Sequence, residues 1–281
     1  MGKPNIAKVL QQATARLNEF TLPRLEAELL LSHVFNKPRS FLLAFAETCL
    51  SANQVRQFTA LLTRRIDGEP LAYILQQKEF FSLPLRVTPD VLIPRSDSEL
   101  LVDKTLAMFP VEKKLSVCDL GTGSGALALA LASQRPQWHL TGIDNSEKAL
   151  AVARENARSL SINNVNFLHS DWLQTVGNKK FAAIVSNPPY VDITDPALEK
   201  NVIAYEPRAA LIAKDKGLAA IKIVARQAKA HLLPQGWLLL EHGYQQGGAV
   251  VELLRALSYK NVSTFNDLNG LPRMTVGRQL G

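Results

Sequence analysis

Leu115-Ser116-Val117-Cys118-Asp119-Leu120-Gly121-Thr122-Gly123-Ser124-Gly125 is the segment that most strongly constrains the architecture of this chain. Residues 115–120 form a mainly apolar run, which predicts a buried strand. The three glycines that follow allow positive φ angles and a close approach of the backbone to a ligand. A helical stretch begins at Gly125, and the N-terminus of a helix directs unpaired N–H groups toward a bound group. The segment therefore predicts a strand, a ligand-binding turn and a helix.

Strands and helices alternate on the C-terminal side of this segment. Apolar patterns predict helices over 98–108, 125–134 and 146–159 and strands over 139–144, 165–168, 181–185 and 237–241. This alternation specifies an α/β fold with an open, mainly parallel sheet covered on both faces. Ligands of such sheets bind at the carboxyl ends of the strands, where Asp119, Asp144 and Asn187 fall.

The glycine spacing narrows the kind of ligand. Gly-x-Gly-x-Gly departs from the Gly-x-Gly-x-x-Gly of dinucleotide folds, and no Gly-Lys-Ser/Thr of a P-loop follows it. Asp144 ends the next strand, 25 residues after Asp119, close to the spacing of about 20 expected of a ribose-binding carboxylate. Alternatively, Asp144 caps the helix that starts near Ser146.

A third acidic position follows the short strand 165–168. Asp171 lies where an adenine amino group would be bound in such a fold, and Trp172 could cover the adenine ring. The competing interpretation is an aspartate in a solvent-facing loop beside a core tryptophan.

The tetrapeptide Asn187-Pro188-Pro189-Tyr190 follows the apolar run 181–185. Each proline lacks an N–H and fixes φ near about −65°, so the strand must end in a stiff turn. The turn exposes the Asn187 side-chain oxygen, the Pro188 carbonyl and the Tyr190 ring, which together suit a planar group bearing an NH2. A strand stopped by two prolines with a tyrosine packed behind them is the alternative.

The N-terminal part of the chain has a different pattern. Residues 1–70 show helical periodicity in two apolar stripes and in a third segment from Ser51, a candidate N-cap, to Arg65. We therefore expect a helical domain over 1–70, a linker over 71–95 with a β-hairpin in 72–87 that bends at Ser82-Leu83-Pro84, and a catalytic domain over 96–281.

Composition limits the possible partners. The net charge of +7 is spread along the 281-residue chain without a basic tract, so we expect no dedicated nucleic-acid site.

Apolar runs are too short to span a bilayer, and the first residues lack an apolar signal core, which predicts a cytoplasmic protein without membrane contact. Cys49 and Cys118 are distant in sequence and belong to no metal-binding motif, so neither a metal site nor a disulfide is expected. A monomer is the default expectation.

Four motifs follow one another in the chain: the glycine turn, Asp144 at a strand end, Asp171 in a loop, and the Asn187-Pro188-Pro189-Tyr190 tetrapeptide. Together they resemble the peptide chain release factor glutamine N5-methyltransferase family of class I S-adenosylmethionine-dependent methyltransferases. The resemblance extends to further segments, namely Glu69-Pro70-Leu71-Ala72-Tyr73-Ile74-Leu75, Val91-Leu92-Ile93-Pro94-Arg95, Tyr205-Glu206-Pro207-Arg208-Ala209-Ala210-Leu211 and Glu241-His242-Gly243-Tyr244-Gln245-Gln246. It implies a Rossmann-like fold with a mainly parallel seven-stranded sheet, whose antiparallel edge would be formed by strands near 262–265 and 274–277. One departure is visible, since the family usually has proline and threonine where this chain has Ser96 and Ser98. The change affects the stiffness of the linker rather than the activity.

The resemblance implies methylation of the glutamine side-chain amide in the Gly-Gly-Gln loop of class-one release factors. S-adenosylmethionine would be the donor and S-adenosylhomocysteine the product. The implied cofactor-binding residues are Gly121, Thr122, Gly123, Ser124, Gly125, Asp144, Asp171, Trp172 and Asn187. The implied catalytic residues are Asn187, Pro188 and Tyr190, and the substrate-binding residues are Asn187, Pro188, Pro189 and Tyr190. The helical domain over 1–70 would help to recognise the release factor. Apart from the resemblance, residues 192–205 have few regular apolar positions and are a candidate lid, and Arg208 is a candidate to position a substrate carbonyl or the chain itself, or to form an ion pair with Glu206 or a neighbour.

The chemistry agrees with this implication. An amide nitrogen is a poor nucleophile, so two acceptors that fix its plane matter more than a base. A DNA adenine N6-methyltransferase uses the same clamp, but it must flip the base and carries a sizeable recognition region. A glutamine methyltransferase acting on a ribosomal protein is chemically identical, and only the contexts Ile93-Pro94-Arg95-Ser96-Asp97-Ser98-Glu99 and Tyr205-Glu206-Pro207 favour the release factor. A non-catalytic scaffold is disfavoured by the intact tetrapeptide.

Overall fold

The computed structural model describes residues 3–194 and 200–280. The chain divides into two compact units, residues 1–76 and 77–281. The boundary thus falls after Gln76 rather than at residue 70, so the segment 71–76 belongs to the helical unit and the β-hairpin to the second unit.

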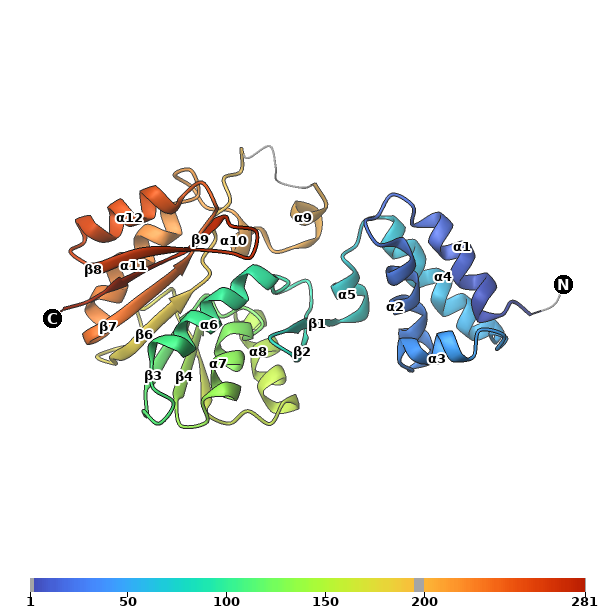
Figure 1. The fold of residues 1–281 in the computed structure, drawn as a ribbon, viewed down its shortest axis with the longest axis horizontal. Coiled ribbons are helices and arrows are strands. Elements are labelled where there is room, and N and C mark those ends of the chain that lie inside the picture. The colour runs from blue at the N-terminus through green and yellow to red at the C-terminus, as the bar shows by residue number, and fades with distance from the viewer. Residues whose placement is uncertain (1–2, 195–199, 281) are drawn as a thin grey trace. The chain divides into compact units, whose positions relative to one another are not determined.

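The first unit is helical and has its own core. Its helices are α1 (Ile6–Arg16), α2 (Pro23–Phe35), α3 (Arg39–Ala44), α4 (Ala52–Ile66) and α5 (Leu71–Leu75) (Figure 1). Ser51 caps α4 as predicted, and Gln54 completes a capping box. Apolar residues of several helices, including Ile6, Leu10, Leu30 and Leu62, form one buried cluster. The short helix α3 was not predicted from the sequence.

The hairpin at the start of the second unit is shorter than predicted. Its strands are β1 (Gln77–Phe80) and β2 (Leu83–Arg86), because residues 71–75 are helical. The bend lies at Phe81 and Ser82, which have φ of 50° and 61°, and not at Ser82-Leu83-Pro84. Positive φ at both central residues matches the twist of a two-residue hairpin turn. Pro84 lies within β2, opposite Glu79.

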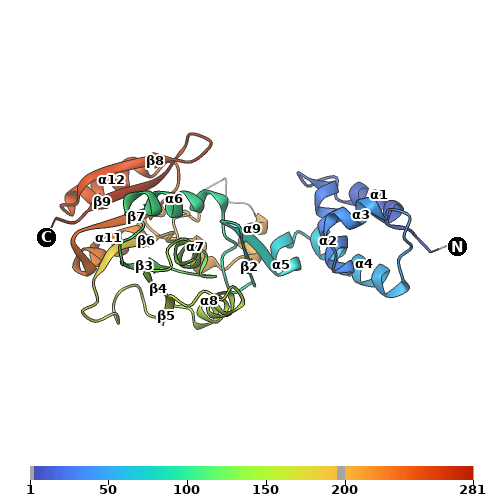
Figure 2. The ribbon, with the colours of Figure 1, turned by 60° about the horizontal axis from the view of Figure 1, so that its bottom comes forward.

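A seven-stranded sheet with the order β5-β4-β3-β6-β7-β9-β8 forms the centre of the second unit. The strands are β3 (Ser116–Leu120), β4 (His139–Asp144), β5 (Val165–His169), β6 (Phe181–Ser186), β7 (Leu232–Glu241), β8 (Lys260–Asn266) and β9 (Pro272–Arg278). Neighbouring strands pair in parallel along β5-β4-β3-β6-β7, and β9 pairs antiparallel with both β7 and β8. The predicted mainly parallel sheet and its antiparallel edge are confirmed. Figure 2 shows the strands following one another across the unit.

Helices cover both faces of this sheet. The 3-10 turn η1 (Ser96–Ser98) leads into α6 (Glu99–Met108), which packs with α7 (Ala126–Gln134) and α8 (Glu147–Ser159) on one face. The other face carries α11 (Ala219–His231) and α12 (Gly247–Ala256), and the short helices α9 (Lys200–Tyr205) and α10 (Arg208–Leu211) precede them in the chain. Residues of β7 alternate between the two cores, with Leu239 in one and Leu238 and Leu240 in the other. None of the helices in the described ranges is long and apolar enough to cross a membrane.

Strand register brings the predicted site residues to one edge. Leu120 of β3 pairs with Ile143 of β4 and with Ser186 of β6, and Ser186 pairs with Leu240 of β7. The residues that come next in the four parallel strands therefore emerge side by side, and they are Gly121, Asp144, Asn187 and Glu241.

Candidate functional site

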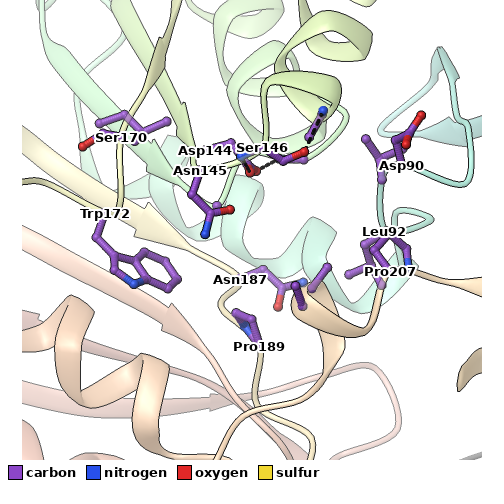
Figure 3. Close-up of a pocket in the computed structure, with 17 residues that line it drawn as sticks. Asp90, Leu92, Asp144, Asn145, Ser146, Ser170, Trp172, Asn187, Pro189 and Pro207 are labelled. Atoms are coloured by element: carbon purple, nitrogen blue, oxygen red, sulfur yellow. Dashed lines mark hydrogen bonds between the residues drawn. The ribbon is translucent and has the colours of Figure 1, made fainter. Parts of the chain in front are cut away.

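A pocket of about 190 Å³ lies at this carboxyl edge of the sheet. Six of the predicted site residues line it, namely Gly121, Gly123, Asp144, Trp172, Asn187 and Pro189. Figure 3 shows Trp172 at one end and Leu92 with Pro207 at the other, with Asp144 and Asn187 between them. The pocket combines a flat apolar ring, a carboxylate and a carboxamide.

The glycine turn brings bare backbone to the wall of the pocket. Gly121 and Gly123 have φ of +74° and +55°, which L side chains rarely adopt. A Cβ added to Gly121 would lie 3.8 Å from the Trp172 ring and 3.9 Å from the Asn187 carbonyl oxygen. A side chain at Gly121 would therefore occupy the space between these two pocket residues.

Asp144 is held by backbone N–H groups on both carboxylate oxygens. Its Oδ2 accepts from Gly123 N at 2.9 Å, and its Oδ1 accepts from Ser146 N at 2.9 Å. The N-cap of α8 is Ser146, whose side chain accepts from Ala149 N, so helix capping does not account for Asp144. Burial raises the pKa of Asp144, and the backbone N–H groups oppose this rise.

Four of the predicted cofactor residues do not line the pocket. Thr122 and Ser124 are buried, and Gly125 is the N-cap of α7 with φ of +85°. The Asp171 side chain is exposed, and its Oδ2 accepts from Gln174 Nε2 at 2.9 Å. Asp171 is thus not among the residues that line the pocket, whereas the neighbouring Ser170 is.

Asp119 ties the glycine turn to the helix that follows. Its side chain is fully buried, and Oδ2 accepts from Thr122 Oγ1 at 2.6 Å and from Ala128 N at 3.2 Å. Oδ1 has no hydrogen-bond partner within the described part of the chain. Burial raises the pKa of Asp119 to about 7. Asp119 therefore supports the turn from behind rather than contacting a ligand.

The tetrapeptide presents Asn187 at the rim and anchors Tyr190 behind it. Asn187 Nδ2 donates to Ser98 Oγ at 2.9 Å, and the Tyr190 hydroxyl donates to Glu241 Oε1 at 3.1 Å. Among the residues whose placement is described, none donates a hydrogen bond to Asn187 Oδ1 or to the carbonyl of the buried Pro188. Asn187 lines the pocket, whereas Pro188 is buried and is not among the lining residues.

Tyr190 is half-buried and does not line the pocket. Burial raises the pKa of its hydroxyl, and the neighbouring Glu241 carboxylate raises it further. The Tyr190 hydroxyl is bound to Glu241, so only the aromatic ring remains for the predicted contact with a substrate amide.

The opposite wall comes from two segments that carry the family resemblance but were not predicted to bind the ligand. Asp90, Val91 and Leu92 line it with Pro207, Ala209 and Ala210. Glu206, which is 5% exposed, accepts from Ile93 N at 3.1 Å and pairs with Arg95. This pair ties the two segments of the wall together.

Two predictions for this region concern Arg208 and the lid. Arg208 is exposed, and within the described residues the ion-pair partner of Glu206 is Arg95 instead. The predicted lid over 192–205 includes residues 195–199, which lie outside the described residues.

Sequence families match both units of the chain. The family model described as "PrmC N-terminal domain" matches residues 8–75. The model described as "Methyltransferase small domain" matches residues 96–227, which include the glycine turn and the tetrapeptide.

Curated relatives match almost the whole chain. The chain is 48% identical to the release factor glutamine methyltransferase of Coxiella burnetii over 92% of both chains. It is 46% identical to that of Escherichia coli over 96% of this chain and 97% of the relative, and 45% identical to that of Vibrio cholerae over 97% and 96%.

Solved structures share the fold at low sequence identity. A methyltransferase from Pyrococcus furiosus has a TM-score of 0.55 and 19% identity, covering 81% of this chain and 99% of the other. The 16S rRNA N2 G1207 methyltransferase of T. thermophilus, solved with AdoMet and guanosine, has a TM-score of 0.54 and 18% identity, covering 72% and 49%. These likenesses show the fold alone, and they confirm the predicted class I methyltransferase architecture.

Proposed function

The chain belongs to the release factor glutamine methyltransferase family, and from this membership we propose that it methylates a glutamine side-chain amide in peptide chain release factors. The methyl group comes from S-adenosylmethionine and goes to N5 of the glutamine in the Gly-Gly-Gln motif, which modulates translation termination. One observation carries the proposal: the Asn187 carboxamide of the Asn-Pro-Pro-Tyr turn stands at the rim of the pocket that the glycine turn lines. The proposal includes action in the cytoplasm as a monomer.

The pocket residues fit S-adenosylmethionine chemically. Asp144 presents a carboxylate that can accept from ribose hydroxyls, and Trp172 offers a flat face to adenine. The absence of a side chain at Gly121 leaves the space between Trp172 and Asn187 free. Nothing in this donor set calls for a metal, and the described residues contain no group of three or more side chains that could hold one.

Asn187 and Pro188 hold the glutamine amide in the proposed complex. The Asn187 side-chain oxygen and the Pro188 carbonyl each accept one N–H of the substrate NH2 group, so the plane of the amide is fixed. Both acceptors stabilise the positive charge that develops on nitrogen. The Tyr190 ring packs beside the amide plane, and Pro189 forms the adjoining part of the pocket wall.

The bound sulfonium supplies a methyl carbon with a neutral thioether as leaving group, so the N–C bond forms as the S–C bond breaks. The alkylated amide nitrogen is then a strong acid, and its extra proton passes to water. No residue of this chain need act as a general base. The task of the protein is to position the amide and to exclude competing acceptors.

Labelled S-adenosylmethionine tests the choice of substrate. The chain is incubated in parallel with a class-one release factor, a ribosomal protein fraction and duplex DNA, and label is expected on the release factor. Label on the ribosomal fraction alone would favour the chemically identical alternative. Label on DNA and on neither protein would overturn the proposal in favour of an adenine N6-methyltransferase.

A further inference from the structure

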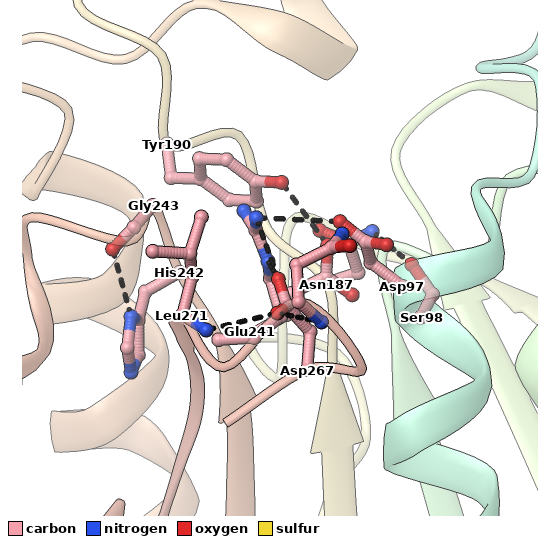
Figure 4. A network of polar contacts seen from close by, with 11 residues as sticks. Asp97, Ser98, Asn187, Tyr190, Glu241, His242, Gly243, Asp267 and Leu271 are labelled. Atoms are coloured by element: carbon pink, nitrogen blue, oxygen red, sulfur yellow. Dashed lines mark hydrogen bonds and ion pairs between the residues drawn. The ribbon is translucent and has the colours of Figure 1, made fainter. Parts of the chain in front are cut away.

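A buried carboxylate lies directly behind the Asn-Pro-Pro-Tyr turn. Glu241 ends β7, is 1% exposed and accepts from the Tyr190 hydroxyl through Oε1 at 3.1 Å. Its Oε2 has no hydrogen-bond partner in standard geometry within the described residues. The Ser98 hydroxyl is near enough to lower the pKa of Glu241, and the unpartnered Oε2 leaves an acceptor to which this hydroxyl can donate. Figure 4 shows Glu241, Tyr190, Ser98 and Asn187 close together, with the Tyr190–Glu241 and Asn187–Ser98 hydrogen bonds as dashed lines.

Ser98 connects the carboxylate to the substrate clamp. A serine hydroxyl has one hydrogen to donate and lone pairs to accept with. When its hydrogen points to the Glu241 carboxylate, only the lone pairs of Oγ face Asn187. The observed bond has this polarity, since Asn187 Nδ2 donates to Ser98 Oγ at 2.9 Å.

We propose that Glu241, acting through the Ser98 hydroxyl, determines which end of the Asn187 carboxamide faces the substrate. Glu241 and Ser98 are then positioning residues, and this role rests on the proposed function. With the NH2 end of Asn187 bound to Ser98, the Oδ1 end faces outward and can accept from the glutamine NH2. If the amide were reversed, two NH2 groups would face each other and one of the two clamp acceptors would be lost.

Polar and charged groups from three other segments surround Glu241. Tyr190 donates to it, Arg273 of β9 lies near it with favourable charge, and Asp97 of η1 repels it. Arg273 also pairs with Asp97 at 3.3 Å and with Asp267 at 3.1 Å. The neighbouring His242 is buried, and burial lowers its pKa. Tyr190, Arg273 and Ser98 thus support the ionised carboxylate within a site that otherwise disfavours charge.

The relay depends on the charge of Glu241. Burial raises its pKa to about 7, against the opposing effects of Ser98, Tyr190 and Arg273. Above this value the carboxylate only accepts, and the relay has the polarity described. Below it the protonated carboxyl can donate to Ser98, whose hydrogen is then free to bind Asn187 Oδ1. We therefore expect kcat to rise with pH through about 7 as one proton is lost.

Four variants separate this relay from a structural role. Glu241→Gln and Ser98→Ala are expected to lower kcat by roughly 10- to 100-fold, as for loss of one preorganised contact. In both variants kcat should no longer fall as the pH drops below about 7, a fall that we call the acid limb of the pH profile. The Kd for S-adenosylmethionine should stay within about 2-fold of wild type. Ser98→Thr keeps the hydroxyl and should retain both the rate and the limb. Asp97→Asn removes a neighbouring negative charge and should keep kcat at high pH while moving the limb to lower pH.

The outcomes distinguish this inference from the proposed function. If the wild-type protein labels no release factor, the proposed function fails. If the wild-type protein is active but Glu241→Gln and Ser98→Ala keep its kcat and acid limb, only the relay fails. Cofactor binding by each variant reports whether its pocket is folded. Should Glu241→Gln not fold, an unchanged limb in the binding-competent Ser98→Ala variant still overturns the relay.

Discussion

At the scale of single residues, two buried carboxylates support the candidate site from different sides. Asp119 holds the glycine turn through Thr122 and Ala128, whereas Glu241 lies behind the Asn-Pro-Pro-Tyr turn and binds Tyr190. Burial raises the pKa of each to about 7. Their neighbours give them separate effects, the first on the stability of the turn and the second on the orientation of an amide.

Asn187→Ala is expected to lower kcat by roughly 10²-fold or more, because it removes one of the two acceptors that fix the substrate NH2 group. The Kd for S-adenosylmethionine should change much less. Steady-state methylation of a release factor and equilibrium titration of the cofactor measure the two effects. Asn166→Ala, at an exposed position of β5, is the matched control. Near-normal turnover by Asn187→Ala would refute the clamp.

Asp119→Asn tests the cost of the buried charge. A carboxyl whose pKa rises from 3.8 to about 7 in the folded state favours folding most below 3.8, and this contribution is lost as the pH rises to about 7. The free energy of unfolding of the wild type should therefore fall relative to the variant by up to about 1.4 kcal/mol per pH unit in this window.

Tryptophan fluorescence reports the unfolding of the second unit, which contains Asp119, because Trp138, Trp172 and Trp237 all lie in residues 77–281. Urea unfolding at several pH values compares the wild type with Asp119→Asn. Asp171→Asn, at an exposed carboxylate, serves as the control. A difference between the wild type and Asp119→Asn that does not vary with pH would contradict the assignment.

At the scale of elements, the strands and helices around the glycine turn could be predicted because their apolar periodicity is local. The predicted strand over 139–144 coincides with β4, and the predicted helix over 98–108 begins one residue before α6. The hairpin was placed wrongly at its start, because the apolar residues of 71–75 fit a short helix as well as a strand. The short helix ends at Gln76, whose φ of 55° is left-handed, and sequence periodicity does not reveal this end.

The site could be predicted only where its residues form local motifs. Gly121, Asp144 and Asn187 each lie at the carboxyl end of a strand and were found from that position. Ser98 and Glu241 come from segments 89 and 54 residues away from Asn187 in the sequence, and only the folded chain brings them to it. Glu241 does end an apolar strand, which was the available signal.

The Glu206 tether gives a prediction at this scale. Glu206→Ala leaves Ile93 N without its acceptor and Arg95 without its partner, so Leu92 and Pro207 lose their support in the pocket wall. We expect the free energy of unfolding of the second unit to fall by about 1–3 kcal/mol. The Kd for S-adenosylmethionine should rise. Tryptophan fluorescence in urea and cofactor titration measure the two.

Glu206→Gln is the matched control, since its side-chain oxygen can still accept from Ile93 N while the ion pair with Arg95 is lost. Its stability should lie between those of the wild type and Glu206→Ala. Equal values for all three proteins would exclude the tether as a support of the wall.

At the scale of the whole molecule, the two units divide the proposed work. Residues 77–281 contain the pocket and the Asn-Pro-Pro-Tyr turn, and residues 1–76 contribute a separate helical core. We propose that the helical unit helps to recognise the release factor. Binding of the release factor outside the pocket would then select one glutamine among the many glutamines of other proteins. The full release factor should then have a much lower KM than an isolated Gly-Gly-Gln peptide, and equal KM values would contradict this role.

Tandem mass spectrometry of the release factor tests the central claim most directly. After incubation with the protein and S-adenosylmethionine, the peptide that contains Gly-Gly-Gln is fragmented to locate any added methyl group. The account predicts one methyl group on the side-chain nitrogen of that glutamine, present with the wild type and nearly absent with Asn187→Ala. An unmodified glutamine together with a methyl group on another residue would contradict it.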